Sequence, residues 1–120
     1  MRLLLVEDDD LNVELFLDIV EAAGDTTVVE RDGLHGRERA LTEPFDVIVL
    51  DIGLPDIPGD DICRALRTEG ITTPIIALSA DALPAQIESR MQAGFDRYLT
   101  KPVSPGTLRA ALLAAKDAHR

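Results

Sequence analysis

Two patterns of apolar residues alternate along the chain. Short runs that are apolar throughout are typical of strands buried on both faces, and apolar residues that recur every three to four positions are typical of helices. The runs predict strands over residues 2–6, 27–30, 46–51, 74–80 and 96–100. The helical pattern predicts helices over residues 11–23, 34–42, 60–69, 83–93 and 104–118, and the stops that follow helices are Gly24, Gly70 and Gly94.

Individual residues indicate how the first two helices begin and pack. The apolar face of the first helix is expected to contain Leu11, Leu15, Ile19 and Ala23. Asp32 is a candidate N-cap for the second helix, in which Gly36 costs roughly 1 kcal/mol relative to Ala.

Five strand–helix pairs in succession predict the fold class. Strands buried on both faces need helices on both sides, so we expect an α/β fold with a doubly wound, five-stranded parallel sheet and right-handed crossovers. The 120 residues make one domain, residues 1–120. Such sheets bind ligands beyond the carboxyl ends of their strands.

The composition disfavours several kinds of partner. The net charge is −10, from 22 acidic and 12 basic residues, and nucleic acids or anionic membranes would repel such a surface. With 3% aromatic residues and no Trp, stacking on bases or on a flat cofactor is not expected. A single cysteine, Cys63, and no signal-peptide or membrane-span pattern lead us to expect a cytoplasmic protein.

Polar residues follow four of the predicted strands, at the edge where this fold binds ligands. They are Glu7 and Asp8 after the first strand, Asp51 at the third, Ser79 at the fourth and Lys101 after the fifth. Clustered carboxylates call for a cation, and Mg²⁺ suits one or two carboxylates together with phosphate oxygens and water. Asp51 would be the nucleophile that forms an aspartyl phosphate, with Lys101 and Ser79 holding phosphoryl oxygens.

Four motifs, in this order, resemble the receiver domains of bacterial two-component response regulators. They are LLLVEDD, DVIVLDIGLPDIPG around Asp51, PIIALSA with Ser79 and YLTKP with Lys101, and the resemblance covers essentially the whole chain. It implies a flavodoxin-like (βα)5 fold with strand order 2-1-3-4-5. It also implies a phosphorylation switch rather than an enzyme, with self-catalysed phosphorylation and autodephosphorylation only.

The resemblance also implies a role for each matching residue. The Mg²⁺ ligands correspond to Glu7, Asp8, Asp51 and the backbone carbonyl of Gly53. The phosphoacceptor corresponds to Asp51, and the residues that contact its phosphoryl group correspond to Ser79 and Lys101. The aromatic switch corresponds to Tyr98, and the Lys101–Pro102 peptide bond is expected to be cis. The positions that tune the lifetime of the acyl phosphate correspond to Gly53 and Asp81.

Partners follow from the same resemblance. A histidine kinase or a histidine phosphotransfer protein would donate the phosphoryl group, docking near residues 11–15 and 102–105. A downstream protein target would bind the face built from residues 82–93 and 98–113. The stretch VEDDDLNVELF and the short chain look most like single-domain regulators of cell-cycle and polarity control. Gly36 and Arg37 depart from the family's usual small or apolar residues, so we expect a loose, mobile second helix.

The remaining acids and reactive residues have ordinary structural interpretations. Asp10 is expected to be the N-cap of the first helix, and Asp9 to lie near the metal without ligating it. Cys63 is expected to be a small buried residue. Surface positions are expected for His35 and His119. Loop and helix-start positions are expected for Asp56, Asp60 and Asp61.

Three other functions remain open from the sequence. A Mg²⁺-dependent aspartyl-phosphate phosphohydrolase would typically have an Asp two residues after its nucleophile, where this chain has Gly53. A flavodoxin-like cofactor-binding protein would need a Ser/Thr-rich loop where this chain has Glu7 and Asp8. A receiver that binds partners without being phosphorylated is the third alternative, and the complete set of site residues argues against it.

Overall fold

A five-stranded parallel sheet with strand order β2-β1-β3-β4-β5 forms the centre of the molecule. The computed structural model describes residues 1–80 and 83–118, so the expectations for Asp81 and His119 lie outside the described residues. The strands are β1 (Arg2–Val6), β2 (Thr26–Glu30), β3 (Val47–Asp51), β4 (Ile75–Ser79) and β5 (Arg97–Thr100). The helices are α1 (Asp10–Ala22), α2 (Gly33–Thr42), α3 (Gly59–Thr68), α4 (Pro84–Gln92) and α5 (Pro105–Ala118). The predicted doubly wound fold is confirmed, with element ends within one residue of expectation.

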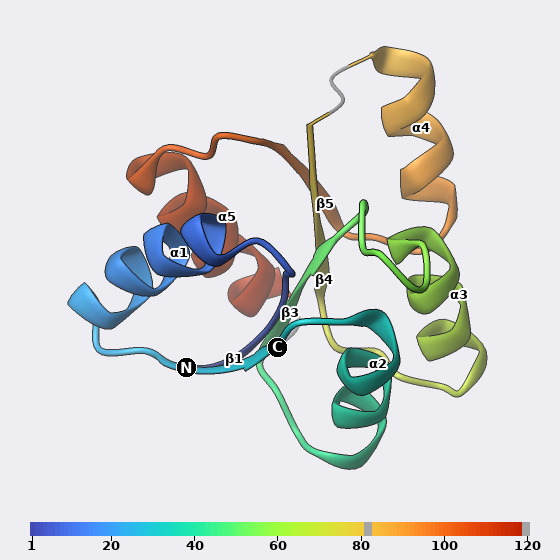
Figure 1. Cartoon of the computed structure of the whole chain (residues 1–120), viewed down its shortest axis with the longest axis horizontal. Coiled ribbons are helices and arrows are strands. Elements are labelled where there is room, and N and C mark those ends of the chain that lie inside the picture. Colours follow the sequence, from blue (N-terminus) through green and yellow to red (C-terminus); the bar gives the residue numbers. More distant parts are fainter. Residues whose placement is uncertain (81–82, 119–120) are drawn as a thin grey trace.

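The helices cover the sheet on both faces. Figure 1 shows α1 and α5 on one side of the sheet, and α2, α3 and α4 on the other. None of the described helices is long and apolar enough to cross a membrane.

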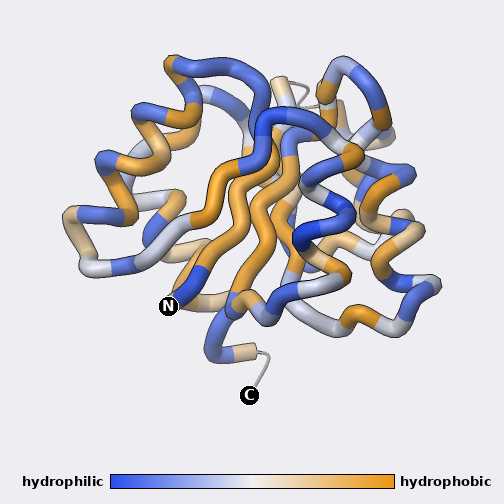
Figure 2. The backbone as a smooth tube through the Cα atoms, turned by 60° about the horizontal axis from the view of Figure 1, so that its bottom comes forward, coloured by the Kyte–Doolittle hydropathy of each residue, from blue (hydrophilic) through white to orange (hydrophobic). Residues whose placement is uncertain are grey.

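Alternate residues of each inner strand enter two separate cores, because successive side chains of a strand point to opposite faces. Leu3 and Leu5 of β1 pack beneath α1 and α5, whereas Leu4 and Val6 pack beneath α2 and α3. Figure 2 shows the resulting band of apolar strands between more polar helices. This double burial explains why the inner strands are apolar throughout instead of alternating.

The start of α1 differs from the expectation. Asp9 is the N-cap, since its backbone is extended and its side chain accepts a hydrogen bond from the Asn12 N–H at 3.0 Å. Asp10 already lies in the first helical turn, where it forms an ion pair with Arg31. The assignment of the cap to Asp10 was therefore wrong, because the helix begins one residue earlier than its apolar pattern.

The buried face of α1 also differs from the one expected. Val13, Phe16 and Val20 are buried, whereas Leu11 and Leu15 are 63% and 50% exposed. Both sets of residues have helical spacing, so periodicity alone does not choose between them. The packing of α1 against the sheet and α5 decides the choice and leaves two leucines on the surface.

Helix α2 packs closely on β1 at Gly36. A Cβ at this position would lie 2.7 Å from both Cγ atoms of Val6, which is too close for non-bonded carbons. Glycine therefore allows the helix to approach the strand, and the expectation of a loose helix was wrong in this respect. Asp32 caps α2 as predicted, by accepting the His35 N–H at 2.8 Å.

Several minor expectations are confirmed. Cys63 is fully buried on α3, and burial raises the pKa of its thiol to about 11. His35 is exposed, although its ring is bonded to Asp32. Asp56 lies in the loop after β3, where it accepts hydrogen bonds from the first N–H groups of α2. The acids of the first turn of α3 are Asp60 and Asp61.

Replacing Gly36 with Ala should destabilise the protein by about 1–3 kcal/mol relative to Gly106→Ala, because Val6 is a stiff, buried residue that cannot yield to the new methyl group. Gly106 is a matched control in α5, since a Cβ there would meet nothing within 4 Å. Urea unfolding of the two variants measures the difference. Equal stabilities would contradict the packing role assigned to Gly36.

Candidate functional site

Strand order brings four polar residues, distant in sequence, to one edge of the sheet. Glu7 follows β1, and its N–H donates to the Glu30 carbonyl at 3.0 Å. Asp51 is the last residue of β3 and Ser79 the last of β4. The Lys101 N–H donates to the Ser79 carbonyl at 2.8 Å, which holds the residue after β5 against the end of β4. The sheet's backbone hydrogen bonds therefore position this group of side chains.

Three carboxylates gather at this edge. Oxygens of Glu7, Asp8 and Asp51 all lie within 4.8 Å of one another. Glu7 is 1% exposed and Asp51 5% exposed, whereas Asp8 is exposed to solvent. Oxygen ligands at this spacing, two of them buried and one open to water, fit a divalent cation such as Mg²⁺.

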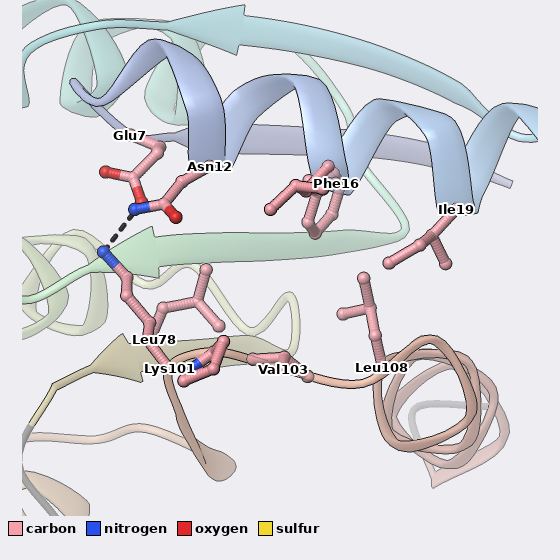
Figure 3. Close-up of a pocket in the computed structure, with 10 residues that line it drawn as sticks. Glu7, Asn12, Phe16, Ile19, Leu78, Lys101, Val103 and Leu108 are labelled. Carbon is pink, nitrogen blue, oxygen red and sulfur yellow. Dashed lines mark ion pairs between the residues drawn. The ribbon is translucent and has the colours of Figure 1, made fainter.

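Lys101 connects the two buried acids. Its Nζ lies 2.7 Å from Glu7 Oε1 and 3.0 Å from Asp51 Oδ1. Figure 3 shows the Lys101 side chain extending toward Glu7. Burial acts to lower the pKa of Lys101, but the close contacts and negative charge of the two acids outweigh it and raise that pKa above its ordinary value. The ammonium therefore stays charged between the two carboxylates.

One lysine does not neutralise the site. Burial, reinforced by the neighbouring Asp51, raises the pKa of Glu7 from 4.5 to about 7, and Lys101 only partly opposes this rise. The contact of Glu7 Oε1 with Lys101 is an ion pair without the geometry of a hydrogen bond, so this buried oxygen lacks a hydrogen-bond partner. A buried acid with an incompletely bonded oxygen is what an additional cation would stabilise.

The loop after β3 also contacts the phosphoacceptor candidate. The Gly53 N–H donates to Asp51 Oδ1 at 3.2 Å, so this oxygen accepts bonds from both Gly53 and Lys101. Gly59 is needed at the start of α3, because a Cβ there would lie 2.7 Å from the Asp51 carbonyl oxygen. Gly59 therefore lets the start of α3 approach the Asp51 backbone, while the Gly53 backbone N–H bonds to its carboxylate.

Other predicted residues lie around this centre. Ser79 is buried, and Tyr98 is half-buried on β5 against the core beneath α3. The Lys101–Pro102 bond is cis, as expected. Asp81 lies outside the described residues.

Sequence reasoning did not single out Asn12. This half-buried residue of α1 lines a cavity of about 60 Å³ together with Glu7 and Lys101. The rest of the lining is apolar and comes from α1, β4, α5 and the loop before α5. The only signal in the sequence is that Asn12 is a polar residue in the first turn of a helix that directly follows Glu7 and Asp8.

Comparison with known proteins identifies the family. Residues 3–113 match the response regulator receiver domain. The chain belongs to this family. The resemblance inferred from the four motifs is thus confirmed, and receiver domains are components of two-component signalling rather than classical enzymes.

Relatives of this receiver domain include both longer and single-domain proteins. The response regulator protein PmrA of Pseudomonas aeruginosa is 40% identical over 114 residues, which cover 95% of this chain and 52% of PmrA. The receiver domain therefore spans about half the length of PmrA. The polar-differentiation response regulator DivK of Brucella anthropi is 35% identical over 103 residues, 84% of each chain. The expected likeness to polarity regulators is therefore found. An equally strong likeness exists to the two-component response regulator ORR41 of Oryza sativa, which is 35% identical over 117 residues that cover 93% of this chain and 91% of ORR41.

Solved structures confirm the receiver fold. The receiver domain of Francisella response regulator 1452 superposes with a TM-score of 0.94 at 29% identity, covering 99% of this chain and 98% of that one. The receiver domain of sensor histidine kinase PA1611 from Pseudomonas aeruginosa gives 0.89 at 31% identity and 97% coverage of both chains. That homologue has a magnesium ion coordinated in its active-site cleft.

The unfolding free energy of the metal-free protein should contain a contribution from Glu7 that falls as the pH rises from about 4.5 to about 7. In this interval the folded protein holds the Glu7 proton that the unfolded chain releases, so unfolding is opposed most strongly at low pH. Glu7→Gln removes the titrating group and should flatten the profile. Urea unfolding at several pH values with a chelator present measures the slope.

Glu14→Gln is the control, because it removes a carboxylate from the exposed face of α1. A Glu7→Gln profile as steep as that of the wild type would show that Glu7 titrates normally.

Proposed function

We propose that this chain is a phosphorylation-switched signalling receiver in which Asp51 accepts a phosphoryl group from a phosphohistidine donor. The observation that carries this proposal is Lys101, held between Glu7 and Asp51 beside a cluster of three carboxylates. The arrangement concentrates negative charge for a cation and provides one fixed positive charge for an anionic substrate. The two alternatives are a phosphohydrolase and a receiver that works without phosphorylation. Each would leave some of these charged residues without a role.

Mg²⁺ would be held by Glu7, Asp8, Asp51 and the backbone carbonyl of Gly53. The clustered oxygens and the incompletely bonded Glu7 Oε1 support this ligand set. When bound, the ion offsets the negative charge that otherwise keeps an anionic phosphoryl group away from Asp51. The exposed position of Asp8 leaves this side of the site open for ion exchange with water.

Asp51 Oδ2 would be the attacking oxygen. Oδ1 already accepts bonds from Gly53 and Lys101, whereas Oδ2 accepts no bond from an N–H group in the described part of the chain. In the transfer, a bond forms between Oδ2 and phosphorus while the bond from phosphorus to the donor's imidazole nitrogen breaks, and its electron pair stays on that nitrogen. Lys101 and the Ser79 hydroxyl would hold the phosphoryl oxygens.

The added phosphoryl group would shift the face formed by α4, β5 and α5. Ser79 and Lys101 would move toward the new oxygens, with Tyr98 turning inward from its half-buried position. No residue of α4 is buried, so few apolar contacts oppose its displacement. A downstream protein target would recognise the altered face.

The phosphodonor would approach from the α1 side. Leu15 lies beside Pro102 and Val103. Its exposed side chain and that of Leu11 would supply apolar area for a histidine kinase or phosphotransfer protein. Gly53 and Asp81 would tune how long the acyl phosphate survives autodephosphorylation.

The proposal also includes a cytoplasmic location and a single domain over residues 1–120. It further includes the absence of direct nucleic-acid or membrane partners, which the net charge of −10 supports.

Incubation with acetyl phosphate and Mg²⁺ should add one phosphoryl group to the wild-type protein, detected by intact-mass spectrometry. Asp51→Asn removes the nucleophile and should abolish the adduct, and chelation of Mg²⁺ should have the same effect. Asp56→Asn is a suitable control, because this loop acid contacts α2 and not the carboxylate cluster. An adduct that persists unchanged in Asp51→Asn would rule out the assignment, and sustained phosphomonoester turnover would favour the phosphohydrolase.

Tyr98 offers an internal probe of the switch. It is the only tyrosine and the chain has no Trp, so tyrosine fluorescence reports this residue alone. Addition of beryllofluoride and Mg²⁺, which mimic the acyl phosphate, should change the fluorescence of the wild type and leave Asp51→Asn unchanged. A constant signal in a wild-type protein shown to bind beryllofluoride would exclude Tyr98 from the switch.

A further inference from the structure

Asn12 lies beside two residues of the proposed phosphorylation site, Glu7 and Lys101. Its backbone N–H is fixed by Asp9 Oδ1 at 3.0 Å, so the start of α1 determines where the residue lies. The side chain lines the small cavity beside Glu7 and Lys101. Figure 3 shows the amide pointing toward the ion pair of these two residues and away from Phe16.

The fold gives no structural role to the side-chain amide of Asn12. Asn is among the weaker helix-forming residues, and it stands here inside the first turns of α1. No residue among 1–80 and 83–118 donates a hydrogen bond to the side-chain amide of Asn12 or accepts one from it. Its role in capping α1 uses only the backbone N–H, which any residue except Pro would provide. An unused amide beside the Glu7–Lys101 ion pair therefore needs another explanation.

The surroundings keep the amide directed at the site. Behind it the cavity is lined by Leu15, Phe16, Val103 and other apolar side chains, and an amide turned toward them would lose its hydrogen bonds to water without replacement. Toward the sheet edge it faces the charged groups of Glu7 and Lys101. The polar direction leads to Lys101, whose ammonium also contacts Asp51, the proposed phosphoacceptor.

The chemistry of the amide suits that group. The two residues at the start of α1, Asp9 and Asp10, are acids, and like the acidic cluster they would repel a phosphoryl oxygen. Asn12 contributes two N–H donors without adding charge. It is a neutral donor beside Lys101, on the helix from which the phosphodonor would approach in the proposed function.

We propose that Asn12 contacts the substrate during phosphotransfer, its amide donating a hydrogen bond to an oxygen of the phosphoryl group as that group passes to Asp51. This role rests on the proposed function. A hydrogen bond to a charged group contributes enough to change a rate by tenfold to a hundredfold.

The test uses phosphoramidate as the probe, with saturating Mg²⁺. Asp51 Oδ2 bonds to phosphorus, the phosphorus–nitrogen bond breaks, and the nitrogen leaves as ammonia with its electron pair and its three hydrogens. Intact-mass spectrometry over time gives the rate constant of phosphorylation. Asn12→Ala, which removes the amide, should lower this rate constant by about tenfold or more.

Two further variants separate hydrogen bonding from shape. Asn12→Asp keeps the shape but replaces the donor with a carboxylate, so it should be slower than Asn12→Ala. Glu14→Ala, on the exposed face of α1, is the matched control and should react at the wild-type rate. The melting temperature of Asn12→Ala and its Mg²⁺ affinity by calorimetry should stay at wild-type values, which a purely structural role would not predict.

The outcomes are distinct. A wild-type rate for Asn12→Ala, or equal rates for Asn12→Asp and wild type, would overturn the role of Asn12 while leaving Asp51 as the phosphoacceptor. Absence of any adduct on the wild-type protein would overturn the proposed function and the role of Asn12 together.

Discussion

The ion pair of Lys101 with Glu7 and Asp51 is the interaction on which this site depends. Two carboxylates buried at one edge of a sheet would be strongly unfavourable without a positive charge, and a single ammonium 2.7 and 3.0 Å from them offsets only part of the cost. Burial and the neighbouring Asp51 therefore keep the pKa of Glu7 near 7. The site is left with an excess of negative charge that a divalent ion would relieve, and in the proposed function this imbalance would link metal binding to phosphoryl chemistry.

The sheet makes this charge arrangement rigid, whereas the helices around it differ in how firmly they are held. Alternate residues of each inner strand pack into two different cores, so no inner strand can shift without disturbing both cores. Helix α2 is fixed by the contact of Gly36 with Val6. Helix α4 has no buried residue, which makes it the element best able to respond when charge is added at Asp51. A fixed site beside a weakly held helix would be the physical basis of the proposed switch.

Much of the fold could be predicted because the signals are local. Apolar runs predicted all five strands, and glycines after helices predicted three of the helix ends, where positive φ angles are observed at Gly24, Gly70 and Gly94. The errors came where two local solutions were equally good. Asp9 and Asp10 are both suitable N-caps, and two sets of apolar residues on α1 have helical spacing. In both cases packing of the whole helix made the choice.

The sequence by itself determined which residue types stand at the carboxyl end of each strand, since alternating strands and helices bring those ends to one edge of a parallel sheet. Only the tertiary structure decided that Lys101 reaches Asp51, fifty positions away, and that Oδ1 rather than Oδ2 accepts its bond. It also decided that the Asn12 amide faces the ion pair. The physical reason is that periodicity records contacts between near neighbours in the chain, whereas contacts between strands depend on strand order, register and side-chain rotamers, which form only when the sheet and its helices pack together.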